Sequence, residues 1–88
     1  MPDTSAKSYP HDGRVSSPDP DICVRFGKRL RKLRLDHGWT QTDVAVHLGM
    51  DRSFLSDLEL GKREPCLRSL ETIALGFGMT VPQLLSRI

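Results

Sequence analysis

Eighty-eight residues with a formal charge of +2 allow one small domain, near the lower size at which a core folds without disulfides or metals. No segment approaches the roughly 20 apolar residues of a membrane span, and the polar N-terminus does not resemble a signal peptide. Cys23 and Cys66 form neither a CxxC motif nor a Cys/His cluster, so we expect no metal site. We expect two free thiols in a reducing cytoplasm, with a single disulfide as the alternative.

The charge is unequally divided along the chain. Residues 1–21 contain two bases, four acids and four prolines, whereas residues 22–88 contain 11 bases and 7 acids. The first segment has almost no large apolar side chain, so we expect a disordered N-terminal arm. The arm is either without function or a site of regulation or protein interaction. The basic remainder favours nucleic acid as a partner.

The first predicted helix begins at Ile22, because Ile22, Phe26, Leu30 and Leu33 recur at intervals that fall on one helix face. It ends at residues 37–38, where a glycine accepts the left-handed conformation of a helix end.

The second predicted helix begins after Thr40, which with Asp43 three residues later forms an N-cap arrangement. Its inner face holds Val44, Ala45 and Leu48, and residue 49 is a glycine that ends it. The third begins after Asp51, whose carboxylate we expect to cap the free backbone N–H groups, and stops near residue 61.

Two further amphipathic helices follow. The apolar face of the fourth consists of Leu67, Leu70, Ile73, Ala74 and Phe77. The fifth begins with a capping box, Thr80 with Gln83, and carries Val81, Leu84, Leu85 and Ile88. No strand-like alternation competes, so the predicted fold class is all-α, with five short helices in residues 22–88.

Residues 41–60 carry the functional signal, because they predict two short helices joined by a tight turn. Steeply crossing helices need a small residue at their contact, which Ala45 provides. The turn needs a residue that accepts positive φ, which Gly49 provides. With Val44, Leu48, Leu55 and Leu58 on the inside, this spacing is typical of a helix-turn-helix.

At this point a family resemblance is plain. The stretch "GWTQTDVAVHLGMDRSFLSDLELGKREPCLRSLETIALGFGM" resembles the Cro/cI-type (XRE-like) helix-turn-helix regulators, and the likeness covers about residues 24–86. The resemblance implies a compact five-helix, lambda-repressor-like DNA-binding domain whose third helix enters the major groove. It also implies a homodimer on palindromic operators, an ion pair between Arg34 and Glu59, and contact of Gln41 with the DNA backbone or an edge base.

The outer face of the third helix holds the candidate base-contacting residues, Arg52, Ser53, Ser56 and Asp57. Arg52 suits guanine O6 and N7, with phosphate contact or plain solvation as alternatives. The two serines suit bases or phosphates equally. Asp57 could accept a hydrogen bond from cytosine N4 or orient Arg52; the alternative is that it points past the groove. Leu60 lies towards the same side. It either contacts a thymine methyl group or is simply an exposed leucine.

Candidate phosphate contacts lie on both sides of that helix. Thr40 and Gln41 begin the second helix, where free N–H groups favour a phosphate. Basic side chains after the third helix offer another contact, or a solvated rim: Lys62, Arg63 and Arg68. The basic run in residues 25–34 is expected to be mainly solvated, with an auxiliary DNA contact by Lys28 or Arg29 as the alternative.

The remaining residues concern assembly and packing. Leu84, Leu85 and Ile88 are too apolar for a free C-terminal turn, so part of them seals the core and the rest predicts a homodimer interface. His37 and His47 are expected to be isolated surface residues, and Trp39 is expected to pack beneath the connection of the first two helices. Cys66 occupies a capping position of the fourth helix, with a redox role as a weaker hypothesis.

Together these features predict a cytoplasmic, dimeric, sequence-specific transcriptional regulator, most simply a repressor, whose partner is double-stranded DNA. We expect no enzymatic activity, because there is no nucleophile–base constellation and no phosphate-cradling glycine loop, and we expect no cofactor. Two alternatives stay open. One is an antitoxin whose N-terminal arm binds a partner protein, and the other is a controller of a restriction–modification system.

Overall fold

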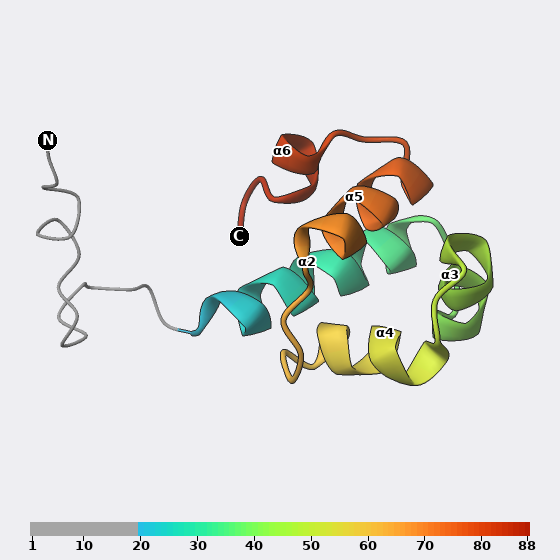
Figure 1. Cartoon of the computed structure of the whole chain (residues 1–88), viewed down its shortest axis with the longest axis horizontal. Helices are drawn as coiled ribbons and strands as arrows, with labels where there is room; N and C mark the ends of the chain where they lie inside the picture. The colour runs from blue at the N-terminus through green and yellow to red at the C-terminus, as the bar shows by residue number, and fades with distance from the viewer. Residues whose placement is uncertain (1–19) are drawn as a thin grey trace, which may run out of the picture.

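The computed structural model describes residues 20–88 and contains five helices there, labelled as in Figure 1. They are α2 (Ile22–Asp36), α3 (Gln41–Leu48), α4 (Arg52–Glu59), α5 (Leu67–Gly76) and α6 (Val81–Leu84). No strand occurs within this range, so the predicted all-α, five-helix fold is confirmed. The predicted arm, residues 1–21, lies outside the described residues except for its last two. None of the helices in residues 20–88 has the length and apolar character needed to cross a membrane.

Helix α2 lies between α4 on one side and α5 and α6 on the other (Figure 1). The helices close around one core because each contributes apolar side chains at helical spacing. The core consists of Phe26, Leu30, Leu33, Val44, Ala45, Leu55, Leu58, Ile73, Ala74, Phe77 and Leu84. Two predicted inward positions are wrong. Ile22 and Leu67 lie in the first turns of α2 and α5 and are 54% and 80% exposed, because the ends of these helices extend past the core.

The contact between α2 and α4 depends on Gly27. A Cβ atom there would lie 2.5 Å from the carbonyl oxygen of Leu58 and closer still to that of Glu59. The backbones of the two helices therefore approach more closely than any side chain at position 27 permits. This approach brings the end of α4 against α2.

The turn between α3 and α4 sets the geometry of the helix pair. Gly49 has φ of +67°, as the predicted turn requires, and the N–H of Met50 donates to the carbonyl of Ala45. Ala45 is 5% exposed, as expected of a small residue at a helix crossing. The predicted N-cap of α3 is also present. The Thr40 hydroxyl accepts from the Asp43 N–H at 3.0 Å, and the Asp43 carboxylate accepts from the Thr40 N–H at 2.9 Å.

Trp39 packs within a small aromatic cluster. Its ring lies 4.6 Å from His37, 5.0 Å from His47 and 5.6 Å from Phe77, measured between centroids. The prediction that the two histidines are isolated is therefore wrong, although both are exposed. His37 Nδ1 lies 2.9 Å from the Leu33 carbonyl, and His47 Nε2 lies 2.8 Å from that of Gly76. The cluster joins α3 to the end of α5.

Arg29 fixes the C-terminal turn to α2. Its Nε donates to the carbonyl of Leu84 at 3.0 Å, and its Nη2 donates to that of Gln83 at 2.8 Å and to the Ser86 hydroxyl at 3.4 Å. Leu84 is fully buried by this packing, so its assignment to a dimer interface is wrong. Leu85 and Ile88 are partly exposed.

Candidate DNA-binding surface

Arg34 of α2 and Glu59 at the end of α4 lie together, as the family resemblance implied. Arg34 Nε donates to Glu59 Oε2 at 2.6 Å and Nη2 donates to Oε1 at 3.0 Å, while Nη1 donates to the carbonyl of Trp39 at 3.0 Å. The side chains are 10% and 3% exposed. The hydrogen bonds to Glu59 raise the pKa of Arg34 above its ordinary value, against the effect of burial. Arg34 therefore stays charged, and its hydrogen bonds to Glu59 hold α4 against α2.

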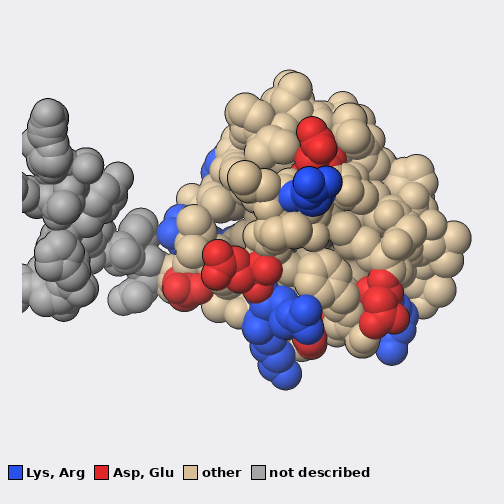
Figure 2. Space-filling model, in the orientation of Figure 1, with Lys and Arg blue, Asp and Glu red and all other residues tan. Residues whose placement is uncertain are grey.

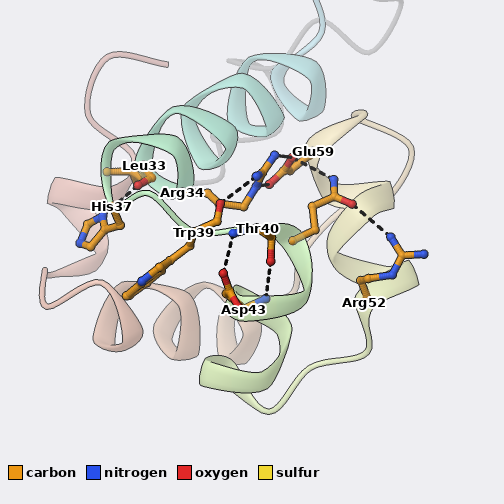
Figure 3. Close-up of polar contacts among 9 residues, drawn as sticks. Leu33, Arg34, His37, Trp39, Thr40, Asp43, Arg52 and Glu59 are labelled. Carbon is orange, nitrogen blue, oxygen red and sulfur yellow. Dashed lines mark hydrogen bonds and ion pairs between the residues drawn. The ribbon is translucent and has the colours of Figure 1, made fainter.

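Gln41, the first residue of α3, links this pair to Arg52 on the outer face of α4. Figure 3 shows Arg34, Glu59 and Arg52, and the dashed lines that connect them. Its Nε2 donates to Glu59 Oε1 at 3.1 Å, so the amide oxygen points away from the carboxylate. That oxygen accepts from Arg52 Nη1 at 3.3 Å. Four side chains therefore form one connected network across α2, α3 and α4.

The network determines where Arg52 lies. Arg52 is exposed in the first turn of α4, the position from which a helix-turn-helix contacts base edges. One of its terminal nitrogens is held by Gln41, which restricts the rotamers of a long side chain without burying its charge. The rest of the guanidinium remains exposed for an acceptor outside the chain.

The other predicted base-contacting residues differ in exposure. Ser53 is exposed, whereas Ser56 and Asp57 are half-buried. The Ser53 hydroxyl donates to the carboxylate of Asp51. Asp51 occupies the N-cap position of α4 but makes no side-chain bond to the backbone, so the predicted bonding of its carboxylate is wrong. The Ser53 hydroxyl donates to this carboxylate in place of the backbone N–H groups at the start of α4.

The predicted phosphate-binding start of α3 is partly occupied by the chain itself. The N–H groups of Thr40 and Asp43 are used in the capping box, and the Gln41 amide is used in the network. Thr40 is exposed and Gln41 is half-buried. The N–H groups that an anion meets at this helix end are therefore those of Gln41 and Thr42.

Basic side chains gather around the loop that follows α4. In Figure 2, a cluster of Lys and Arg side chains lies at the lower edge of the molecule, over the segment between α4 and α5, and a separate blue patch lies higher, over α5. Lys62, Arg63 and Arg68 are all exposed. The guanidinium of Arg63 lies 5.1 Å from the ring centroid of Phe54, so a cation–π contact ties this loop to α4. Lys62 and Arg63 follow the end of α4 opposite to Arg52, and Arg68 lies in the first turn of α5.

Cys66 occupies the N-cap position of α5 but makes no bond to the backbone there. Its Sγ lies 3.4 Å from the hydroxyl of Ser69, and this contact lowers the pKa of the exposed thiol. Cys23 is also a free thiol. Within residues 20–88, no group of three His, Cys, Asp or Glu side chains is placed to bind a metal ion.

Comparison with known proteins gives consistent results. Residues 25–86 match a family model described as a helix-turn-helix domain. The chain is 41% identical over 69 residues to control protein C.MunI of Mycoplasma sp, covering 77% of this chain and 93% of that protein. It is 38% identical over 65 residues to the HTH-type transcriptional regulator DdrOP3 of Deinococcus deserti, covering 74% of this chain and half of that protein.

Two solved structures are similar over most of their length. The restriction–modification controller C.AhdI from Aeromonas hydrophila superposes with a TM-score of 0.67 at 34% identity, over 70% of this chain and 94% of that one. The controller C.Esp1396I, solved as a tetramer with its natural 35 base-pair operator, superposes with a TM-score of 0.66 at 27% identity. That match covers 76% of this chain and 92% of the controller.

Proposed function

Because the chain belongs to the Cro/cI-type (XRE-like) family of helix-turn-helix regulators, we propose that it is a sequence-specific transcriptional regulator of double-stranded DNA. Helix α4 lies in the major groove, with Arg52, Ser53, Ser56 and Asp57 towards the bases. The folded unit is residues 22–88, with the helix-turn-helix at residues 41–60. The protein acts in the cytoplasm and has no catalytic role.

The observation that carries this proposal is the hydrogen bond between Gln41 and Arg52. An exposed arginine in the first turn of the second helix of the motif is positioned by a residue of the first helix. Such positioning suits a bidentate contact with guanine, which requires the guanidinium fork in one orientation and contributes about 1–3 kcal/mol of discrimination. Ser53 donates its hydroxyl hydrogen bond to Asp51, so its single side-chain oxygen is available to DNA as an acceptor only.

Phosphate contacts on both sides of α4 supply the sequence-independent affinity. At the start of α3 they involve Thr40 and the backbone N–H of Gln41, because the Gln41 amide serves the network instead. Beyond α4 they involve Lys62, Arg63 and Arg68, which are all exposed. This division explains how α4 binds a polyanion although residues 51–59 contain three acids and one base.

The protein binds a palindromic operator as a homodimer and acts most simply as a repressor. A controller role in a restriction–modification system is the second candidate. Its support is that C.MunI and C.AhdI are controllers whose whole length this chain nearly spans, at 93% and 94%. The antitoxin alternative depends on residues 1–21, of which residues 1–19 lie outside the described part of the chain, so it stays a prediction.

Selection of bound sites from random duplex DNA tests the proposal. Wild-type protein is expected to select a motif with two symmetric half-sites, and their spacing reports a dimer. Arg52→Ala is expected to lose the preference at one base pair per half-site while still binding DNA. An unchanged motif in Arg52→Ala contradicts the assignment of Arg52, and selection of no motif by the wild-type protein contradicts sequence-specific binding.

A further inference from the structure

Two grooves meet at Ile88, where residues 85–88 follow α6 and lie beside α2. The first, the acidic groove, is lined by the carboxylates of Asp21 and Glu64 and by apolar side chains that include Ile22 and Leu85. The second, the basic groove, is lined by Arg25, Lys28, Arg29, Lys32 and Arg87. Ile88 belongs to both linings, so one apolar residue separates a negative surface from a positive one.

The apolar part of this surface is accessible to solvent. Ile22 is 54% exposed, and Leu85 and Ile88 are partly exposed, although all three are strongly apolar. Their exposure on adjoining elements leaves apolar area in contact with water, which favours a partner that covers it.

The negative charge of the acidic groove affects the pKa of a neighbouring thiol, that of Cys23. Burial, and then the charges of Asp21 and Glu64, raise the pKa of Cys23. Figure 2 shows acidic side chains near the start of α2, on the side of the loop that precedes α5.

The positive charge of the basic groove is concentrated on one helix face. Residues 25, 28, 29 and 32 are spaced at i, i+3, i+4 and i+7, so like charges lie side by side and repel one another. In residues 20–88, Lys32 is the one member of the groove that forms an ion pair, with Asp36 at 3.3 Å. The groove therefore favours an acidic partner.

Arg29 and the backbone conformation at Arg87 determine where Ile88 lies. Arg29 binds the carbonyls of Leu84 and Gln83, which fixes the turn after α6 against α2. Arg87 has φ of +67°, a left-handed conformation that is unfavourable for a residue other than glycine. Among the described residues it is the only one other than glycine with positive φ. This unfavourable conformation occurs at the point where the chain brings Arg87 and Ile88 beside α2.

We propose that this surface binds a second copy of the chain, with Ile88 near the two-fold axis and the acidic groove of each copy against the basic groove of the other. The inference rests on the proposed homodimer and specifies its interface. A two-fold axis that passes through Ile88 brings patches on opposite sides of that residue face to face. Glu64 of one copy then faces Arg87 and Lys28 of the other, and the apolar residues Ile22, Leu85 and Ile88 are covered between them.

DNA bound to α4 does not reach the basic groove. Gly27 and Arg34 lie on the face of α2 that contacts α4. At 100° per residue, Lys28 and Lys32 lie about 100–140° around the helix from Gly27. The positive face of α2 is therefore turned away from α4, which leaves it for protein rather than for the same duplex.

Charge reversal in two separate chains tests the interface. Glu64→Lys and Arg87→Glu are each expected to weaken self-association at least tenfold in sedimentation at low salt, because each places like charges opposite one another. An equimolar mixture is expected to recover wild-type association, because both contacts in the mixed dimer then join opposite charges. Arg31→Glu, an exposed change on α2 outside both grooves, is expected to leave association unchanged. Unaltered circular dichroism of each variant shows that the fold is retained.

Wild-type association by both single variants overturns this interface, as does a mixture that stays dissociated. In either case a wild-type motif with paired half-sites leaves the proposed function intact. A wild-type protein that sediments as a monomer at micromolar concentration and selects single half-sites overturns both this interface and the proposed dimer, but not DNA recognition by α4.

Discussion

Glu59 accepts two hydrogen bonds from Arg34, at 2.6 and 3.0 Å, although 25 residues separate them along the chain. Both side chains are nearly buried, so the carboxylate and the guanidinium depend on each other for their hydrogen bonds. The pair also fixes the orientation of Gln41 and through it Arg52. One contact therefore serves the stability of the fold and the placement of a DNA-contacting side chain.

Removal of one partner is expected to be costly. Arg34→Met leaves the Glu59 carboxylate buried without its counter-ion, and we expect the free energy of unfolding to fall by about 3–5 kcal/mol. Urea unfolding followed by circular dichroism measures this loss. Asp36→Asn is the control, because it breaks the ion pair with Lys32, whose side chains are 67% and 57% exposed, and its cost is expected to stay below about 1 kcal/mol. Equal losses in the two variants contradict the structural role of Arg34.

The hydrogen bond of Gln41 predicts an indirect effect on specificity. Gln41→Ala removes the partner of Arg52 without changing the charge of the surface, so Arg52 samples more rotamers. We expect weaker discrimination at the base pair that Arg52 contacts, with unchanged preference at other positions. Competition binding with single-base variants of the selected site measures this effect. If Gln41→Ala lowers affinity equally for all sequences, the residue acts through phosphate and not through Arg52.

Gly27 predicts a steric effect. In Gly27→Ala the added Cβ meets the carbonyl oxygens of Leu58 and Glu59, which are backbone atoms and cannot rotate away. The helices must separate, at an expected cost of about 1–3 kcal/mol in the free energy of unfolding. Arg31→Ala, the same introduced residue at an exposed position of α2 outside both grooves, is expected to have little effect. A Gly27→Ala protein as stable as Arg31→Ala contradicts the close approach of α2 and α4.

The periodicity of apolar residues was sufficient to predict five helices and the turn at Gly49, because both depend on neighbours within a few positions. It did not predict that Leu67 is exposed, because the end of a helix follows the same period whether or not the core extends beneath it. The contact of Arg29 with Leu84 joins residues 55 positions apart, and nothing in the basic run of α2 distinguishes Arg29 from its neighbours.

The site was predicted unevenly for a similar reason. Arg52 was identified because its position in the first turn of α4 is a local property. The bond between Ser53 and Asp51 was missed, because at this N-cap a side chain and the backbone N–H groups compete for the same carboxylate. The link from Glu59 through Gln41 depends on how three helices pack, so local sequence spacing alone was not sufficient to predict it.

The capping box of α3 predicts a pH-dependent contribution to stability. The Thr40 backbone N–H, and then its side chain, hold the pKa of Asp43 below its ordinary value of 3.8. Because the pKa of Asp43 is lower in the folded chain than in the unfolded chain, the ionised carboxylate stabilises the fold at pH values above 3.8. This contribution is lost as the pH falls through the folded-state pKa. Asp43→Asn is therefore expected to be less stable than wild type at neutral pH, with the difference shrinking in acid. Thermal unfolding of both proteins as a function of pH measures it, and a constant difference contradicts the prediction.

The cations after α4 predict a change in salt dependence. Lys62→Ala and Arg63→Ala each remove one proposed phosphate contact, so the slope of log affinity against log salt is expected to fall by about 0.9 per variant. The selected motif is expected to stay the same, because phosphate contacts carry no sequence information. Fluorescence anisotropy with the selected duplex between about 50 and about 200 mM salt measures the slope. Arg31→Ala, which removes an exposed charge from α2, is the control and is expected to retain the wild-type slope. If all three variants lower the slope equally, the effect reflects net charge and the loop has no specific contact with DNA.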